Sequence, residues 1–310
     1  MFPKHHGILS PVVTPFREDL SPDPERFVEH CQWLVSQNAG LAVFGTNSEA
    51  NSLSVAERRF LLEALLLAGI SPDRMMPGTG CCSLTDTVEL TRHAVAVGCA
   101  GVLMLPPFYY KGVSDDGLFR AYSEVIQRVG SPNLRIYLYH IPPVAQIPIT
   151  ARLIERLLRE YPGTIAGIKD SSGDWSNTEM LLRNFQPQGF DVFCGSDPFL
   201  LQTLRGGGAG CITATGNVNP AMIHDLYANW RASDADARQA RVTQIRRTFE
   251  MIPLIASMKA VIGWKRKDPQ WAELRPPLDR APKDKLEQLC ARLDEIGFRM
   301  DPWETDRHDA

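Results

Sequence analysis

Residues 165–174 have the sequence IAGIKDSSGD, a short apolar run that ends in Lys169 and continues at once into an acid and two hydroxyls. Lysine is rarely buried completely unless a partner neutralises it or a reaction uses it. In a sheet surrounded by helices, reactive side chains collect at strand ends and in the loops that follow. Lys169 is therefore either a solvated strand end or a nucleophile. The rest of the sequence is needed to distinguish these alternatives.

Similar short apolar runs recur along the first two thirds of the chain, most of them bounded by Gly or Pro. They are rich in Val, Ile, Leu and aromatic residues, as buried parallel strands are. We predict strands at residues 7–13, 40–45, 74–80, 100–105, 134–139, 164–169, 190–195 and 210–214. The run at 74–80 fits the strand pattern least well.

Amphipathic stretches such as 24–37, 54–69 and 85–98 lie between these runs and predict helices. Ser54 and Glu57 form a capping box at the start of the second stretch. The third starts with a capping threonine and ends in glycine. Eight strand–helix alternations over about 225 residues is the number expected for a (β/α)8 barrel.

The alternative fold is a doubly wound sheet that binds a dinucleotide, and it would require a GxGxxG turn after the first strand. Here the first strand continues into 14-TPFREDLSPDPE-25 instead. The fold class is therefore predicted to be α/β, a (β/α)8 TIM barrel.

No strand-like run follows residue 221, and the rest of the chain has the pattern of helices. These predicted helices are 221–233, 234–252, 254–265 and 283–298. We expect a barrel catalytic domain over residues 1–232 and a small C-terminal helical domain over residues 233–310.

The composition, with 44% hydrophobic and 22% charged residues and a net charge of −3, is ordinary for a soluble protein and argues against a nucleic-acid partner. The short basic runs Arg246–Arg247 and 265–267 are expected to be solvated helix faces or ends. The seven cysteines form no CxxC pair, which favours reduced thiols in a cytosolic protein.

The N-terminal residues contain no apolar core followed by a small-residue cleavage site, so no secretion signal is expected. The longest uncharged apolar run, residues 94–107, is too short to cross a bilayer. We expect a soluble cytoplasmic protein without a membrane partner.

The carboxyl ends of barrel strands and the loops after them form the working face of such a fold. On that criterion the candidate segments are 45–49 (GTNSE), 106–112 (PPFYYKG), 139–144 (YHIPPV), 169–171 (KDS), 195–197 (GSD) and 213–220 (TATGNVNP). No strand end offers paired His and carboxylate ligands, and there is no HExxH motif. A metal-dependent enzyme is therefore not expected, and no metal site is predicted.

Lys169 has the chemistry of a Schiff-base nucleophile. Burial in an apolar barrel disfavours the charged form of an amine, so free amine becomes available near neutral pH. Such an amine attacks a ketone, and the protonated iminium then withdraws electrons from the adjacent carbon. Tyr139 is the best candidate for the proton shuttle, because it ends the neighbouring strand and faces the same side as Tyr137.

The turn at residues 45–49 is suited to a small carboxylate. The backbone N–H groups and side chains of Thr46 and Asn47 can hydrogen-bond a planar anion without a guanidinium. The alternative is a plain turn at the entry of a helix. Glu49 is expected to be a structural acid bonded to backbone, and His140 a structural residue that points away from Tyr139.

Together, VTPF at 13–16, GTNSE, PPFYYKG, YHIP and GIKDSSGD resemble the dihydrodipicolinate synthase / N-acetylneuraminate lyase family. The resemblance covers nearly the whole chain, from about Gly7 to the C-terminal helices. Members are pyruvate-handling class I aldolases that form a Schiff base on a (β/α)8 barrel. The resemblance therefore implies a lyase that needs no cofactor and acts on a small 2-oxo acid.

Site roles follow from the resemblance for each matching position. Lys169 matches the Schiff-base lysine and Tyr139 the proton-relay tyrosine, while Thr46 and Asn47 match the pair that binds the pyruvyl carboxylate and relays protons. Tyr109 matches an aromatic residue that often reaches the site of a neighbouring subunit. Further substrate-binding positions are Ser171, Gly195 and Ile212. The resemblance also implies a homo-oligomer, a tetramer built as a dimer of dimers.

Departures from the family pattern bear on the substrate. Dihydrodipicolinate synthases place an arginine for the carboxylate of aspartate semialdehyde where this chain has Val144, a loss worth a few kcal/mol of recognition. Asn47 replaces a threonine of the hydroxyl relay. Members that cleave 4-hydroxy-2-oxoglutarate often have a hydroxyl–Asn pair here, a serine at the position of Ser171, and a motif similar to GTGCCS at 78–83.

The predicted reaction is retro-aldol cleavage of a 4-hydroxy-2-oxo acid, with 4-hydroxy-2-oxoglutarate as the model substrate. The first alternative is dihydrodipicolinate synthase, which condenses pyruvate with aspartate semialdehyde. A sugar-acid dehydratase or aldolase is the next alternative. A silent barrel that only binds a keto acid is the alternative from outside the enzymes.

Overall fold

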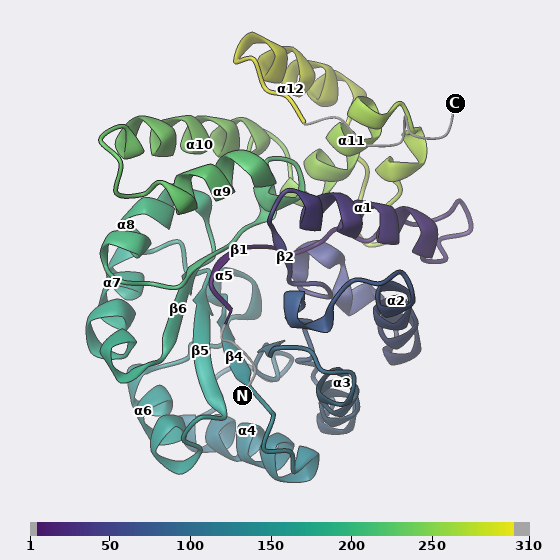
Figure 1. Cartoon of the computed structure of the whole chain (residues 1–310). Helices are drawn as coiled ribbons and strands as arrows, with labels where there is room; N and C mark the ends of the chain where they lie inside the picture. Colours follow the sequence, from purple (N-terminus) through teal and green to yellow (C-terminus); the bar gives the residue numbers. More distant parts are fainter. Residues whose placement is uncertain (1–4, 301–310) are drawn as a thin grey trace.

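The computed structural model describes residues 5–300, and its seven strands in that range form one parallel sheet in the order β2-β1-β7-β6-β5-β4-β3. The sheet curls on itself and helices surround it (Figure 1). This is the TIM-barrel-like α/β fold that the alternation of strands and helices predicts. The strands are β1 (Gly7–Ser10), β2 (Gly40–Leu41), β3 (Val102–Met104), β4 (Ile136–His140), β5 (Ile165–Asp170), β6 (Asp191–Cys194) and β7 (Gly210–Ile212).

Residues 74–80, predicted as the third of eight strands, lie between β2 and β3 without forming a named strand. Met75 makes a parallel bridge to β2, and Gly78 makes one to β3. Pro77 has no N–H to donate, and a Cβ at Gly78 would lie 2.1 Å from the carbonyl oxygen of Phe44. These residues therefore lie between β2 and β3 as predicted. The close approach of Gly78 to the Phe44 backbone leaves isolated bridges in place of a continuous series of strand hydrogen bonds.

Two different apolar clusters cover the inner and the outer face of the curled sheet. The inner cluster contains Leu9, Ala42, Met76, Leu103, Tyr137, Tyr139, Phe193 and Ile212. The outer cluster, which includes Leu138 and Ile168, packs the other face of the strands against the helices. Alternation along β4 therefore puts both tyrosines of that strand inside, as predicted.

The helices follow the strands in the predicted alternation. They are α1 (Pro24–Ser36), α2 (Val55–Leu67), α3 (Leu84–Ala96), α4 (Asp115–Val129), α5 (Pro142–Ala145), α6 (Ala151–Glu160), α7 (Trp175–Asn184), α8 (Leu200–Arg205), α9 (Pro220–Ala228), α10 (Ala235–Phe249), α11 (Leu254–Arg266) and α12 (Lys283–Glu295). Ser54 and Glu57 form the expected capping box at α2. The N-cap of α3 is Ser83 rather than the predicted threonine, because the Ser83 hydroxyl accepts the Asp86 N–H.

Helices α10, α11 and α12 lie together beyond α9 and α1 (Figure 1). Their apolar side chains, including Phe249, Val261 and Leu293, form one cluster with Val13 and Ala214 from the carboxyl ends of β1 and β7. The C-terminal helices therefore pack directly against the end of the sheet at which the candidate site residues lie.

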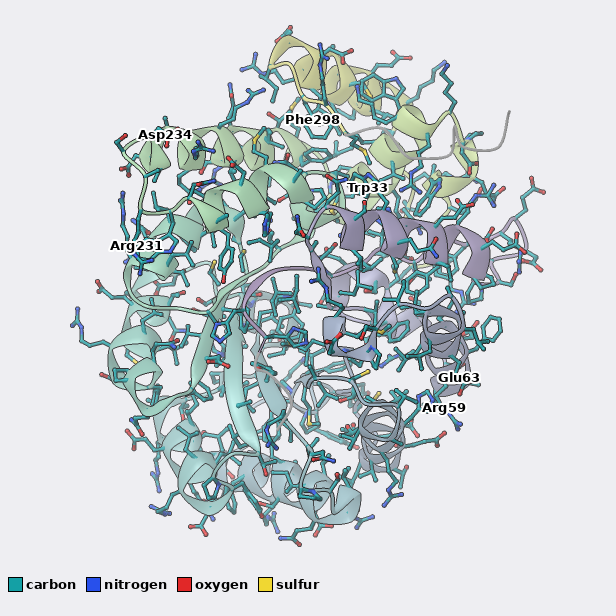
Figure 2. The ribbon with its side chains drawn as sticks, viewed as in Figure 1. Trp33, Arg59, Glu63, Arg231, Asp234 and Phe298 are labelled. Atoms are coloured by element: carbon teal, nitrogen blue, oxygen red, sulfur yellow. The ribbon has the colours of Figure 1, made fainter. Side chains whose placement is uncertain are left out.

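Charged side chains cover the outside of the helices. Figure 2 shows Arg59, Glu63, Arg231 and Asp234 on this surface, whereas Phe298 is buried at 3% exposure. All seven cysteines are free, in agreement with the expectation from their spacing. Within residues 5–300, no helix is both long and apolar enough to cross a membrane.

Candidate active site

Lys169 lies inside the sheet near the carboxyl end of β5. A register shift between β4 and β5 at Ile136 and Tyr137 sets the alternation, so that Ile168 faces outward and Lys169 inward. Lys169 is 2% exposed, and its Nζ lies 4.3 Å from the centroid of the Tyr139 ring. Among the described residues, no carboxylate forms an ion pair with this amine. It is therefore an enclosed amine beside an aromatic face, the setting expected for a nucleophile rather than a solvated strand end.

Tyr139 connects Lys169 to the turn after β2. It is the register partner of Lys169 across the β4–β5 ladder, and its hydroxyl lies 3.1 Å from Thr46 Oγ1. Either hydroxyl can donate in this hydrogen bond. The Tyr139 ring thus lies against the amine, while its hydroxyl and the Thr46 hydroxyl form a hydrogen-bonded pair that can pass a proton.

The turn that carries Thr46 and Asn47 is a short 3-10 helix, Thr46–Ser48, and both side chains are half-buried at the end of the sheet. The Gly45 N–H donates to Ser48 Oγ at 3.2 Å. Thr14, from the VTPF segment, donates its hydroxyl to the Ser48 carbonyl at 2.7 Å. These bonds hold the turn without using the Asn47 side chain or the Thr46 hydroxyl, which keeps its contact with Tyr139.

The three predicted substrate-binding residues lie at the carboxyl ends of β5, β6 and β7. Ser171 follows β5, Gly195 follows β6, and Ile212 is the last residue of β7. A Cβ at Gly195 would lie 2.0 Å from Ser171 Oγ, so these two residues touch and leave no space for a larger side chain. Ile212 is fully buried in the inner cluster that also contains Tyr139. The fold therefore brings the three predicted substrate-binding positions to the end of the sheet where Lys169 lies.

Tyr109 lies apart from this group in the single chain. It is 72% exposed, and its ring contacts Tyr110 edge-to-face at 5.3 Å. Its predicted role at a neighbouring subunit's site stays a prediction.

The ionisable neighbours of Lys169 along the chain have structural partners. The carboxylate of Asp170 accepts the Thr178 hydroxyl at 2.6 Å and the Asn177 amide at 3.0 Å. His140 Nδ1 accepts the Ile149 N–H at 3.0 Å, and burial lowers the pKa of this imidazole. Both side chains therefore accept hydrogen bonds from neighbouring parts of the protein, which agrees with the structural role expected for His140.

Asp197, in the candidate segment 195–197, has buried partners that were not predicted. Asp197 is fully buried and accepts the hydroxyls of Thr213 at 2.7 Å and Thr215 at 2.8 Å, while Arg246 of α10 lies 3.4 Å away. Burial raises the pKa of Asp197, although the arginine and the two hydroxyls oppose the shift. The solvated face expected for Arg246–Arg247 is therefore wrong for Arg246, because the tertiary fold brings it to a buried acid.

Glu49 also has an unpredicted partner. Its carboxylate accepts the Arg275 backbone N–H at 3.0 Å, as expected for a structural acid, and it also binds Lys259 Nζ at 2.7 Å. Both partners lie more than 200 residues away along the chain. No local sequence signal connects these positions.

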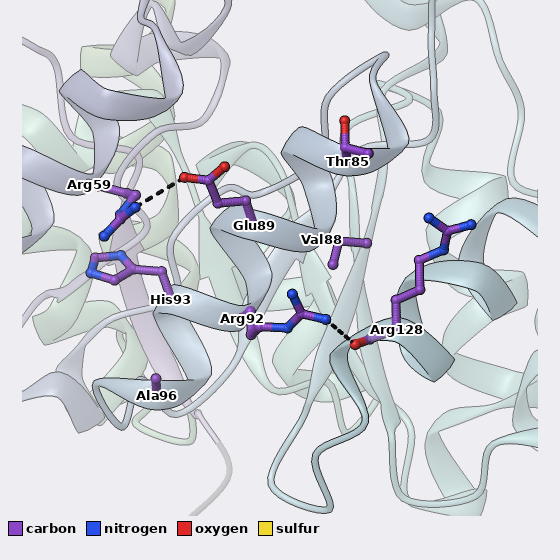
Figure 3. Close-up of a pocket in the computed structure, with 8 residues that line it drawn as sticks. All are labelled: Arg59, Thr85, Val88, Glu89, Arg92, His93, Ala96 and Arg128. Atoms are coloured by element: carbon purple, nitrogen blue, oxygen red, sulfur yellow. Dashed lines mark hydrogen bonds and ion pairs between the residues drawn. The ribbon is translucent and has the colours of Figure 1, made fainter.

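A hollow of about 620 Å³ lies elsewhere, on the outer surface of α2, α3 and α4 (Figure 3). Arg59 in this hollow pairs with Glu89, and Arg128 pairs with Glu124. The guanidinium of Arg92 donates to the Arg128 carbonyl. Since the hollow lies on the outer surface of the helices and away from the inner face of the sheet that carries Lys169, we place the active site at Lys169 instead.

Known proteins match the chain over nearly its full length. The model of the dihydrodipicolinate synthetase family matches residues 4–296. An uncharacterized DapA-like lyase of Chloroflexus aurantiacus is 35% identical over 293 residues, which cover 94% of this chain and 96% of the relative. Dihydrodipicolinate synthase from Agrobacterium tumefaciens has a TM-score of 0.86 at 28% identity, covering 94% of this chain and 99% of its own. YagE of E. coli K12, a member of the same family in complex with pyruvate, has a TM-score of 0.83 at 26% identity, covering 95% and 99%.

Proposed function

The chain belongs to the dihydrodipicolinate synthetase family and is a lyase of the class I aldolase type, and from that premise we propose its reaction. The proposed reaction is retro-aldol cleavage of a 4-hydroxy-2-oxo acid, which releases pyruvate or a close relative and an aldehyde. The observation that carries this proposal is the buried Lys169 amine against the ring of Tyr139, whose hydroxyl is in hydrogen-bond contact with Thr46.

In the proposed mechanism, the neutral Lys169 amine attacks the C2 carbonyl of the substrate, and water leaves to form an iminium ion. The Tyr139 phenol gives its proton to the departing water, and the phenolate that remains, in hydrogen-bond contact with Thr46, accepts the proton of the C4 hydroxyl. The C3–C4 bond then breaks, and its electron pair enters the iminium to give an enamine while the aldehyde departs. Protonation at C3 and hydrolysis of the iminium release the 2-oxo acid and restore the amine.

The substrate carboxylate is proposed to bind the turn at Thr46 and Asn47. Both side chains remain half-exposed at the end of the sheet, and backbone N–H groups in such a turn suit a planar anion. Ser171 and Gly195 are proposed to line the opposite side of the bound acid, with Ile212 beneath it. YagE, which binds pyruvate, supports this class of ligand.

Val144 argues against dihydrodipicolinate synthase as the main activity. It lies in α5, is 60% exposed, and occupies the place at which those synthases carry a carboxylate-binding arginine. An apolar side chain at that place cannot supply a bidentate contact to a second carboxylate.

Parallel assays with the purified chain test the proposal. Pyruvate release is measured from 4-hydroxy-2-oxoglutarate and from keto-deoxy sugar acids, and condensation of pyruvate with aspartate semialdehyde is measured under the same conditions. We expect cleavage of a 4-hydroxy-2-oxo acid to be faster than the condensation by at least tenfold in kcat/KM. Efficient condensation would contradict the argument from Val144, and binding of keto acids without turnover would favour the silent barrel.

Three further expectations belong to this proposal. Residues 1–232 are proposed as the catalytic barrel and 233–310 as a helical domain, although the shared apolar cluster ties the two closely together. The chain is proposed to form a dimer of dimers, with Tyr109 at a subunit contact. It is proposed to work in the cytoplasm.

A further inference from the structure

The turn at 45–49 ends in a backbone conformation that needs support. Glu49 has φ 55° and ψ 34°, in the left-handed region that residues with a Cβ rarely adopt. Such a conformation persists where surrounding bonds over-determine it. Backbone bonds hold the turn from within, from the Glu49 N–H to the Thr46 carbonyl at 3.1 Å and from the Ser52 N–H to the Glu49 carbonyl at 2.8 Å. The Glu49 side chain adds a connection from the end of the turn to a distant part of the chain.

The carboxylate of Glu49 is held by the C-terminal part of the chain. One oxygen binds Lys259 Nζ of α11 at 2.7 Å, and the side chains of Glu49 and Lys259 are both 0% exposed. The other oxygen accepts the Arg275 N–H at 3.0 Å. Glu49 therefore joins the turn directly to two points of the C-terminal segment.

The Arg275 guanidinium extends the same attachment. It donates to the carbonyl oxygens of Ser52 at 2.5 Å and Leu20 at 2.9 Å. The ring of Phe16 lies near both cations, 4.5 Å from Lys259 Nζ and 4.8 Å from Arg275 Cζ. Lys259 and Arg275 thus connect the segment after β1, the turn after β2 and the C-terminal helices.

A fully buried ion pair is a costly way to stabilise a fold, because desolvation offsets the attraction between the charges. Burial lowers the pKa of Lys259 to about 8 even though Glu49 opposes the shift. An apolar pair of similar volume would often be as stable. The best-attested benefit of such a pair is a defined geometry, since a buried charge has one place where it is satisfied.

We infer that Lys259 is a positioning residue for catalysis, which acts through Glu49, together with the Arg275 backbone N–H, to hold the turn that presents Thr46 and Asn47 to the substrate carboxylate. The C-terminal helices are then a working part of the active site rather than an appendage to the barrel. This inference deepens the proposed function and rests on it for the identity of the bound carboxylate.

Three variants test the inference. Lys259→Met leaves the Glu49 carboxylate buried with the Arg275 N–H alone, whereas Glu49→Gln with Lys259→Met removes both charges together. Lys265→Met is the matched control, since Lys265 lies on the same helix and pairs with Asp294 at 3.4 Å, away from the turn.

The first readout is hydrogen exchange of the backbone amides of residues 45–53, which needs no ligand. The second is the pyruvate concentration that gives half-maximal borohydride trapping on Lys169, measured well below the melting temperature of each variant. We expect the double variant to regain much of the stability that Lys259→Met loses. We also expect its turn to exchange at least tenfold faster than in the wild type, and its half-saturating concentration to rise at least tenfold. Lys265→Met should change neither quantity by more than twofold.

A double variant with wild-type exchange at the turn and wild-type half-saturation would overturn the inference and leave the pair a purely structural role. If Lys259→Met does not fold, the double variant decides alone. If the wild-type chain traps no 2-oxo acid, the proposed function falls, and the exchange rates still decide whether Lys259 positions the turn.

Discussion

Replacing Tyr139 by Phe tests the proton relay with the loss of a single oxygen atom. The phenol ring and its contact with Lys169 remain, while the hydrogen bond to Thr46 Oγ1 at 3.1 Å disappears. A positioned general acid or base contributes about 10²- to 10⁴-fold to a rate. At about 1.36 kcal/mol per tenfold, this is about 3–5 kcal/mol of transition-state stabilisation.

The effect on stability should be much smaller. One neutral hydrogen bond contributes about 1 kcal/mol, and Thr46 is half-exposed, so water can replace the lost partner. A domain of this size then melts about 2–4 °C lower. We therefore expect kcat for cleavage to fall at least a hundredfold, while thermal denaturation shows a nearly intact fold.

Tyr137 provides a matched control on the same strand and the same face. It is 1% exposed, and its hydroxyl donates to Asp191 at 3.3 Å rather than to Thr46. We expect Tyr137→Phe to leave kcat within about threefold of the wild type. Equal losses in the two variants, or a Tyr139→Phe enzyme with nearly full kcat, would refute the relay.

A double-mutant cycle asks whether Tyr139 and Thr46 act as one unit. Thr46→Val removes the partner hydroxyl, and residues that act together show strongly non-additive losses. The double variant should therefore lose little more activity than Tyr139→Phe alone. Full additivity would mean that the hydroxyls contribute independently.

Three further perturbations have defined outcomes. Val144→Arg places a guanidinium at a position that is 60% exposed, and steady-state kinetics should show an about tenfold lower KM for aspartate semialdehyde. Gly195→Ala puts a Cβ 2.0 Å from Ser171 Oγ, so thermal denaturation should show a loss of about 1–3 kcal/mol in the free energy of unfolding. The Arg275 guanidinium lowers the pKa of Glu57 from 4.5 to about 2, so this pair should contribute stability above about pH 4.5 that is lost as the pH falls toward 2. Because Glu57 is partly exposed, urea denaturation should show a contribution of about 1–2 kcal/mol, absent in Glu57→Gln.

Controls for these perturbations lie elsewhere in the chain. Gly117→Ala, at a glycine of α4 whose added Cβ meets only Ser114 Oγ at 3.6 Å, should not destabilise the fold. Glu287→Gln removes an exposed acid 3.9 Å from Lys283, and it should leave the pH dependence of unfolding unchanged. A wild-type KM for aspartate semialdehyde in Val144→Arg would contradict the role assigned to that position.

Local patterns predicted the elements that depend on short-range physics. The capping box of Ser54 and Glu57 marks the start of α2, and strand alternation puts Tyr139 on the same side as Tyr137. The apolar run before Lys169 identified β5 and its inward-facing lysine. These features follow from periodicity and capping, which a single segment contains.

Contacts between residues that lie far apart along the chain could not be predicted from local sequence patterns. Arg246 looks like part of a solvated basic run, yet it lies 3.4 Å from buried Asp197. Lys259 reaches Glu49 from 210 positions away. The strand predicted at residues 74–80 does not form; only isolated bridges at Met75 and Gly78 lie there. The close approach of Gly78 to the Phe44 carbonyl depends on a residue that the local pattern does not contain.

The proposed reaction requires that Lys169 forms a Schiff base with a 2-oxo acid. Its most direct test is intact mass spectrometry after incubation with pyruvate and borohydride, for the wild type and for Lys169→Ala. We predict a single reduced pyruvyl adduct on the wild type and none on the variant. An adduct of equal yield on Lys169→Ala, or no adduct on the wild type with pyruvate or any of a panel of 2-oxo acids, would contradict it.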